Sequence, residues 1–148
     1  NLSNNGEEST TAEIKLVNNV PYLKIEQVLA DVTGRFLLYC NNKSILVMGG
    51  IVTSPQIAEF RYANSTSSYL QFGEDTIQEQ KNMKTVDIAD STVWVTRTLK
   101  KSDVNKLLNA STISAWLGND GYMVWGAYAT VGNVRKKISD FVDNCLNY

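Results

Sequence analysis

The segment from Ser111 to Cys145 constrains the fold more than any other part of the chain. Two runs rich in aromatic and β-branched residues, 111–117 and 122–129, flank the turn Gly118-Asn119-Asp120-Gly121, and this pattern predicts a β-hairpin. The apolar residues that follow recur at the spacing of a helix with one apolar face. They are Val134, Ile138, Phe141, Val142 and Cys145. We therefore expect a C-terminal amphipathic helix that packs on the sheet.

The rest of the chain is mostly of strand character. Strands are predicted at 13–17, 35–40, 44–51, 59–62, 68–72, 83–88 and 91–99, with the pairs at 35–51 and 59–72 forming hairpins. Residues 44–51 are interrupted by Gly49-Gly50, which indicates a bulge or bend, and both strands of this hairpin are expected to be buried. Residues 22–30 fit a helix slightly better than a strand, and both interpretations stay open.

Two segments carry little strand signal. Residues 73–84 are charged and glutamine-rich, which predicts an exposed loop. Ser102 followed by Asp103 is a reasonable N-cap for a short helix. The order of elements predicts an α+β fold, in which an antiparallel sheet or sandwich carries this short helix and the C-terminal helix. Residues 1–12 are expected to be a polar leader or tether, and residues 13–148 a single domain.

The composition is that of a globular protein without a bulk charge. Hydrophobic residues make up 43% of the chain, charged residues 20%, and the formal net charge is −1. This argues against a nucleic-acid partner. No run of about 18 apolar residues occurs, so no membrane span is expected. The chain starts at Asn1 without a basic or apolar leader, and any targeting segment is expected to have been removed.

The charges are nevertheless divided unevenly along the chain. Lys and Arg number 7 against 11 Asp and Glu in residues 1–90, and 7 against 4 in residues 91–148, which gives −4 and +3. Part of the positive excess is Arg135-Lys136-Lys137 at the start of the final helix, where cations oppose the helix macrodipole. These residues form either a basic patch for an acidic partner or a solvated helix face, and we favour the helix face.

The absence of histidine limits the available chemistry. It removes the commonest general base and the commonest metal ligand, so no metal or cofactor is expected. Cys40 and Cys145 form either a disulfide, which implies an oxidising compartment, or two buried free thiols in a cytosolic protein. We favour the disulfide, and with it a periplasmic or extracellular location.

Motifs for catalysis are equally scarce. The sequence contains neither a Gly-x-Ser-x-Gly elbow nor a Ser-x-x-Lys pair, and it lacks a phosphate-binding Walker motif. A wall hydrolase would need a pair of carboxylates, for which Glu74 and Asp120 are the candidates. Both are expected in polar loops or turns, which do not provide the apolar setting that raises the pKa of a catalytic acid. We expect a protein that is not an enzyme.

Aromatic residues in the predicted C-terminal hairpin are the remaining positive signal. Strand alternation places Tyr122 and Tyr128 on one face and Trp125 on the other, with Trp116 in the preceding strand. They are either core residues or anchors for a partner. The core is favoured, but the candidate partner-binding residues are Trp116, Tyr122, Trp125, Tyr128, Arg135, Lys136 and Lys137.

Three features together resemble a known family. They are Arg-Phe-Leu-Leu-Tyr-Cys-Asn-Asn at 35–42 with a strand directly after it, Glu-Phe-Arg-Tyr at 59–62, and a closing strand and helix that ends in Cys145. This series is similar to the periplasmic accessory proteins of type VI secretion, the VasI or TagO family, over roughly residues 33–146. It resembles the invasion-associated locus B family more distantly.

The resemblance implies an exported, disulfide-bonded, non-catalytic domain that binds a protein partner at the bacterial cell envelope. It carries over Cys40 and Cys145 as the bridge and Arg61 as a structural arginine, and it implies no active site. An envelope inhibitor or superinfection-exclusion factor, encoded by a phage or a bacterium, is the alternative. A carboxylate-dependent cell-wall hydrolase is the third.

Overall fold

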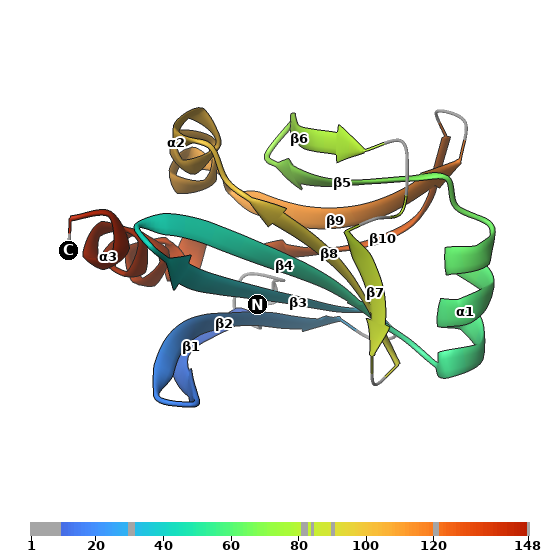
Figure 1. Ribbon diagram of the computed structural model, residues 1–148, viewed down its shortest axis with the longest axis horizontal. Coiled ribbons are helices and arrows are strands. Elements are labelled where there is room, and N and C mark those ends of the chain that lie inside the picture. Colours follow the sequence, from blue (N-terminus) through green and yellow to red (C-terminus); the bar gives the residue numbers. More distant parts are fainter. Residues whose placement is uncertain are drawn as a thin grey trace, which may run out of the picture.

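The computed structural model describes residues 10–29, 32–80, 83, 85–89, 91–119 and 122–147, which form two antiparallel sheets and three α-helices (Figure 1). The larger sheet has the order β1 (Thr10–Val17), β2 (Val20–Leu29), β3 (Val32–Asn41), β4 (Ser44–Val52), β8 (Thr92–Thr98), β7 (Val86–Ala89). The smaller sheet has the order β10 (Tyr122–Thr130), β9 (Thr112–Asn119), β5 (Ser67–Phe72), β6 (Asp75–Gln80). The helices are α1 (Pro55–Ala63), α2 (Lys101–Asn109) and α3 (Arg135–Leu146). The predicted α+β class is confirmed.

Tight turns set the register of the first four strands. Asn18 and Asn19 have φ of 51° and 66°, and Asn42 and Lys43 have φ of 53° and 64°. Two consecutive residues with positive φ make the type I′ turn, whose twist matches that of a hairpin, and asparagine tolerates this conformation well. The β1–β2 and β3–β4 hairpins follow directly from these two dipeptides.

The core lies between the two sheets, where alternate residues of each strand point inward. Fully buried side chains come from both sheets: Leu23, Ile25, Phe36, Leu38, Ile45, Val47, Leu70, Ile113 and Leu117. At Gly34 of β3 the two sheets come very close, because an added Cβ would stand 2.5 Å from the carbonyl oxygen of Tyr128 in β10. A side chain at position 34 would push the sheets apart.

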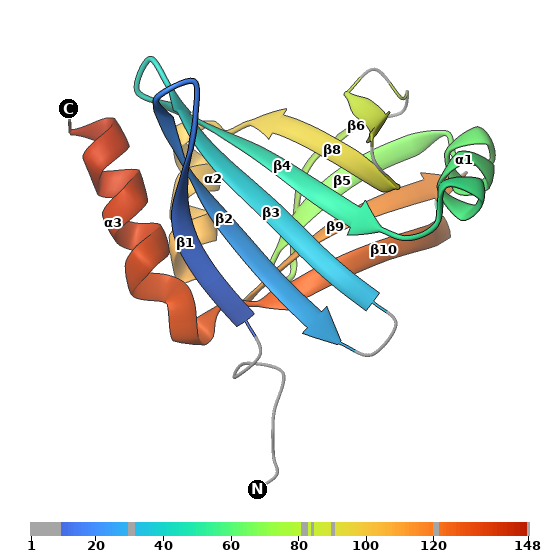
Figure 2. The same ribbon diagram turned by 90° about the horizontal axis from the view of Figure 1, so that it is seen from below.

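The helices cover the ends of this sandwich. Figure 2 shows α3 beside β1 at one end and α1 at the other. The predicted apolar face of α3 is confirmed, because Ile138, Val142 and Cys145 are buried and Phe141 packs against the core. Helix α2 starts at Lys101 rather than at the predicted cap Ser102, and the carboxylate of Asp103 accepts a hydrogen bond from the backbone N–H of Lys100 (3.4 Å).

A buried arginine joins four of these elements. Arg97 of β8 is only 2% exposed, and its guanidinium donates to the carbonyl oxygen of Gln78 (2.9 Å), to both oxygens of Ser68 (2.8 and 2.9 Å) and to the Thr85 hydroxyl. Gln78 in turn donates to Asp103 of α2 (2.8 Å). Burial lowers the pKa of Arg97 to about 10.

Two predicted elements are wrong. Residues 59–62 belong to helix α1 instead of a strand, because Ser54 caps the first turn and Pro55 occupies its first position, a start signal that outweighs a four-residue alternation. The predicted loop 73–84 contains β6, which is anchored in the core by the fully buried Ile77. Besides this anchor, β5 supplies the backbone partners that a strand needs.

The N-terminal segment also differs from the prediction. Residues 10–12 begin β1 instead of ending a tether, whereas residues 1–9 lie outside the described part of the chain. The segment 22–30 is a strand over its described residues, and Ala30 lies outside them. Leu23 and Ile25 face the core while Tyr22, Lys24 and Glu26 face outward, an alternation that pairing on both sides reinforces.

Candidate protein-binding surface

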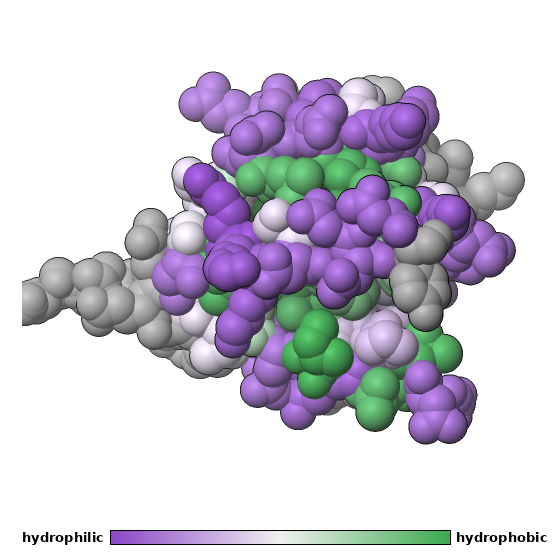
Figure 3. All heavy atoms as spheres, turned by 90° about the vertical axis from the view of Figure 1, so that its left-hand side faces the viewer, coloured by the Kyte–Doolittle hydropathy of each residue, from purple (hydrophilic) through white to green (hydrophobic). Residues whose placement is uncertain are grey.

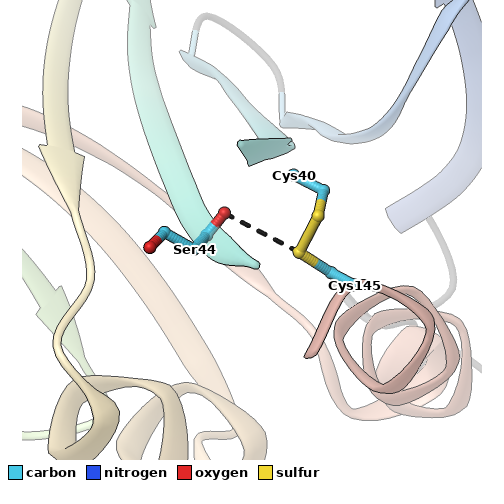
Figure 4. The surroundings of a disulfide bond; sticks show 3 residues. All are labelled: Cys40, Ser44 and Cys145. Atoms are coloured by element: carbon cyan, nitrogen blue, oxygen red, sulfur yellow. Dashed lines mark hydrogen bonds between the residues drawn. A yellow bond between two sulfur atoms is a disulfide. The ribbon is translucent and has the colours of Figure 1, made fainter. Parts of the chain in front are cut away.

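The two cysteines are joined in a disulfide. Cys40 at the end of β3 and Cys145 in α3 have Cα atoms 5.6 Å apart and are separated by 105 residues in the chain. The bridge holds the last turn of α3 against the larger sheet (Figure 4). The Cys145 sulfur lies 3.7 Å from the carbonyl oxygen of Ser44, which is a contact rather than a hydrogen bond because a disulfide sulfur carries no hydrogen. Neither cysteine is a free thiol.

The C-terminal hairpin divides its aromatic side chains between core and surface. Trp125 pairs with Leu117 and packs against the core. Tyr128 points outward and is 43% exposed. Tyr122 is the first residue of β10 and pairs with Asn119. The predicted alternation of this strand thus holds for Trp125 and Tyr128.

Trp116 is held flat on the outer face of the smaller sheet. It lies over Gly126, where an added Cβ would stand 2.2 Å from a ring carbon of Trp116. The ring stacks on Tyr69 with centroids 6.5 Å apart, and its N–H donates to the hydroxyl of Ser114 (2.8 Å). Its polar atom is therefore satisfied within the domain. Among the predicted aromatic anchors whose side chains the structure describes, Tyr128 is the exposed one.

The three predicted basic residues do not converge on one patch. Each is engaged on a different side of α3: Arg135 with the carbonyl of Ala110 (3.0 Å), Lys136 with Asp140 (3.1 Å), and Lys137 with the carbonyl of Ala12 (2.9 Å). Two of these side chains tie the helix to neighbouring elements. Arg135 and Lys137 therefore have a structural use that the sequence did not predict.

A larger apolar surface lies on the outer face of the larger sheet, which was not among the predicted sites. Figure 2 looks onto this face, and no helix crosses β2, β3, β4 or β8 there. Its side chains form rows across the strands. One row is Tyr22, Tyr39 and Leu46, the next is Lys24, Leu37 and Met48, and the third is Glu26, Arg35, Gly50 and Trp94. We call the side chains of Tyr22, Leu37, Tyr39, Leu46, Met48 and Trp94 the outer band.

The outer band is half-buried and internally packed. Tyr22 and Tyr39 stack with ring centroids 4.9 Å apart, and burial raises the pKa of Tyr39. Trp94 lies over Gly50, where an added Cβ would meet its ring at 2.7 Å. Gly50 therefore sits in a continuous strand register rather than in the predicted bulge, and its missing side chain makes room for the indole.

Ion pairs border the outer band on the side of β1 and β2. Lys15 contacts Glu13 at 2.8 Å, and Glu26 accepts hydrogen bonds from Arg35 at 2.7 and 2.9 Å. The hydrogen bond and charge of Lys15 hold the pKa of Glu13 below its usual value. Lys24 contacts Glu26 at 3.6 Å. The border therefore carries both signs of charge, with Glu26 shared between Lys24 and Arg35.

The sequence contained a signal for this surface. The two apolar strands 35–40 and 44–51 are expected from the sequence to be buried, whereas in the structure they largely alternate between buried and half-exposed residues. Leu37 and Met48 belong to the half-exposed set. A run that is apolar on both faces either lies between two layers or leaves one apolar face for a partner, and the sequence does not distinguish these cases.

The carboxylates considered for catalysis stand apart. Glu74 and Asp75 are exposed at the turn between β5 and β6 and line an open groove of about 620 Å³ with Lys106. Asp120 lies outside the described residues. Among the residues that the structure describes, no group of three or more Cys, Asp or Glu side chains could hold a metal ion. Arg61 on α1 is half-buried, and its Nε makes no hydrogen bond there.

None of the described helices is both long enough and apolar enough to cross a membrane. Comparison of the chain with protein-family models, with curated proteins and with solved structures finds no match. The function is therefore argued from the surface of the molecule.

Proposed function

We propose that this chain is an exported, non-catalytic domain that binds a protein partner at the bacterial cell envelope through the outer band of its larger sheet. The observation that carries the proposal is this open sheet face with six half-exposed aromatic and aliphatic side chains in neighbouring rows. An antiparallel sheet with one face on a core normally presents polar side chains on the other. A contiguous apolar patch with a polar border is typical of a protein interface.

The chemistry of the band fits a protein partner. Tyrosine and tryptophan bury large areas at low entropic cost, and they dominate the binding energy of many interfaces. Here three of them, Tyr22, Tyr39 and Trp94, are fixed by stacking or by a glycine beneath the ring. Preorganised rings lose little freedom on binding. The partner surface expected opposite them is apolar at its centre and carries few charges.

The disulfide supports the proposed location. Bridges of this kind form and persist in oxidising compartments and are rare in the cytosol. Fractionation of the native host with thiol labelling tests this part. In the periplasmic or extracellular fraction, the unreduced protein should take up no alkylating label and the reduced protein two. Recovery in the cytosol with both thiols labelled would remove the support for export.

The binding surface is tested with two variants that place charge on opposite sides of the sandwich. Leu37→Lys combined with Met48→Lys interrupts the outer band, whereas Tyr128→Lys changes the exposed aromatic of the smaller sheet. Tyr128 is exposed, whereas Leu37 and Met48 are half-buried and lie in one row with Lys24. Urea titration therefore checks that each variant is folded before its binding is compared. Ser102→Lys on the exposed face of α2 controls for added charge.

The readout is crosslinking in the envelope of the native host, followed by identification of the crosslinked protein. The same partner should be recovered with the wild-type, Tyr128→Lys and Ser102→Lys chains, and lost with the Leu37→Lys, Met48→Lys chain. Loss with Tyr128→Lys alone would move the interface to the smaller sheet. Equal recovery with all four chains would overturn the outer band as the binding surface.

A further inference from the structure

Strand β1 is an edge of the larger sheet, and part of its backbone is left open. The type I′ turn at Asn18-Asn19 makes Val17 and Val20 a hydrogen-bonded pair. In an antiparallel pair every second residue forms backbone hydrogen bonds with the neighbouring strand, so the backbones of Lys15 and Glu13 also bond to β2. The backbone N–H and C=O groups of the residues between them point to the open edge: Leu16, Ile14, Ala12 and Thr10.

At the Thr10 end of β1 the outward-facing backbone groups already have side-chain partners, which confirms the alternation. Asn133 donates to the carbonyl of Thr10 (3.1 Å), and Lys137 donates to the carbonyl of Ala12 (2.9 Å). In the described part of the chain no such bond reaches Ile14 or Leu16. The open edge therefore consists of these two residues next to the hairpin turn, a template for another strand.

An apolar groove lies beside the open edge, between β1–β2 and α3. It consists of two hollows of about 400 and 570 Å³ that share Ile14, Phe141 and Asn144. The exposed fractions of Ile14 and Leu16 are 56% and 67%, high values for such side chains. Figure 3 faces this side and shows hydrophobic side chains in its lower half, at the level of the hairpin, as well as in a separate band higher up.

The opposite face of the same strand carries a charge pattern. Glu13 and Lys15 point to the outer side of the sheet, on either side of Ile14, and about half of each side chain is exposed. A strand that pairs antiparallel with β1 and centres on Ile14 places one residue opposite each of them. Opposite charges at those two places stabilise the pairing, and like charges oppose it.

We propose that the open edge of β1 binds an extended segment of a partner protein, which adds to the larger sheet as an antiparallel strand. Its backbone bonds to Ile14 and Leu16, a basic residue faces Glu13 and an acidic residue faces Lys15. Its apolar residues, on the core side, enter the groove beside Phe141. This is recognition by strand addition, and it stands independently of the outer band.

A second copy of the chain fits this edge less well. A two-fold axis at Ile14 satisfies the same charges, because Glu13 then faces Lys15 of the other copy. However, α3 lies on the core side and beyond the edge of β1, as Figures 1 and 2 show together. In a dimer about this axis, the α3 helices of the two copies would occupy the same space. A single extended segment carries no such helix and avoids this clash.

The test uses a synthetic peptide with the sequence of residues 10–17, Thr-Thr-Ala-Glu-Ile-Lys-Leu-Val, blocked at both ends. Antiparallel to β1 it presents Lys to Glu13, Glu to Lys15 and Leu to Ala12. A second peptide with Glu and Lys exchanged has the same composition and the opposite pattern. The matched peptide should bind about tenfold more tightly in a calorimetric titration.

Two protein variants locate the site. Ile14→Pro removes an N–H that faces the edge and no bond to β2, so the fold should persist while peptide binding is lost. Glu13→Lys combined with Lys15→Glu should reverse the preference between the peptides. Equal affinity for both peptides, or unchanged binding by Ile14→Pro, would overturn the proposal. A dimer in sedimentation that Ile14→Pro dissociates would overturn the peptide as occupant and assign the edge to a second copy.

Discussion

Arg97 shows how a single residue can hold several elements together. Its described hydrogen-bond partners are neutral oxygens on β5, β6, the segment before β7 and β8 itself, so neutral protein groups solvate the buried charge. A guanidinium can serve this many acceptors because it carries five N–H groups in a plane. No other cationic side chain reproduces that geometry.

We expect Arg97→Lys to lower the free energy of unfolding by about 3 kcal/mol, because several buried oxygens lose their donors while the charge stays buried. Urea denaturation followed by circular dichroism measures the change. Arg61→Lys is the matched control, since Arg61 is half-buried with its Nε unbonded, and it should shift stability by about 0.5 kcal/mol or less. Equal losses in the two variants would contradict the role assigned to Arg97.

Part of this network is readable from the sequence. Alternation through Val93, Val95 and Arg97 places the arginine on the core face of its strand. Its acceptors are not readable, because Ser68 and Gln78 lie 29 and 19 residues away and belong to the other sheet. The resemblance pointed to Arg61 instead. The same limit applies to Gly50, whose role depends on an indole from another strand.

At the scale of elements, the disulfide fixes α3 to the larger sheet. Helix α3 contributes three buried side chains to the core and is also held through Arg135 and Lys137. The bridge therefore acts mainly on the unfolded chain, by closing a loop with a sequence separation of 105. The folded arrangement of α3 has enough contacts to survive its loss.

Replacement of both cysteines by alanine should accordingly lower the free energy of unfolding by about 5 kcal/mol, the loop-closure value for a loop of this length, and leave the folded structure intact. Urea titration gives the first quantity, and circular dichroism in the near ultraviolet checks the second. Unchanged stability would mean that the unfolded chain is already compact without the bridge. A lost near-ultraviolet spectrum would mean that the bridge orders α3.

The elements that the sequence predicted well are those with a long, one-sided pattern. The C-terminal helix and the β3–β4 and β9–β10 hairpins are of this kind. The wrong or open assignments fall on segments whose state depends on pairing with other strands. Among its residues of described burial, β6 has Ile77 as its fully buried anchor, and β2 owes its state to pairing with β1 and β3. Local pattern alone cannot supply these partners.

For the molecule as a whole, the sequence does not determine which apolar faces pack against each other. Hydrophobic strands such as β3 and β4 fit either a layer covered on both sides or a sheet with one open face. The second sheet covers one side of them, and the other side remains as the outer band. The predicted aromatic site shared this ambiguity, and its residues divided between the core, at Trp125, and the surface, at Tyr128. Neither division follows from the pattern of one strand.

The two sheets should unfold together, because neither covers its own apolar face. Leu70 and Ala115 of the smaller sheet meet Phe36 around Gly49 of the larger one. We expect one cooperative transition in urea, tested with two variants that keep a single tryptophan, Trp94 on the larger sheet or Trp116 on the smaller. In each variant, fluorescence and far-ultraviolet circular dichroism should give the same midpoint. A Trp94 signal that changes before or after the Trp116 signal, relative to circular dichroism, would show that the sheets are separate folding units.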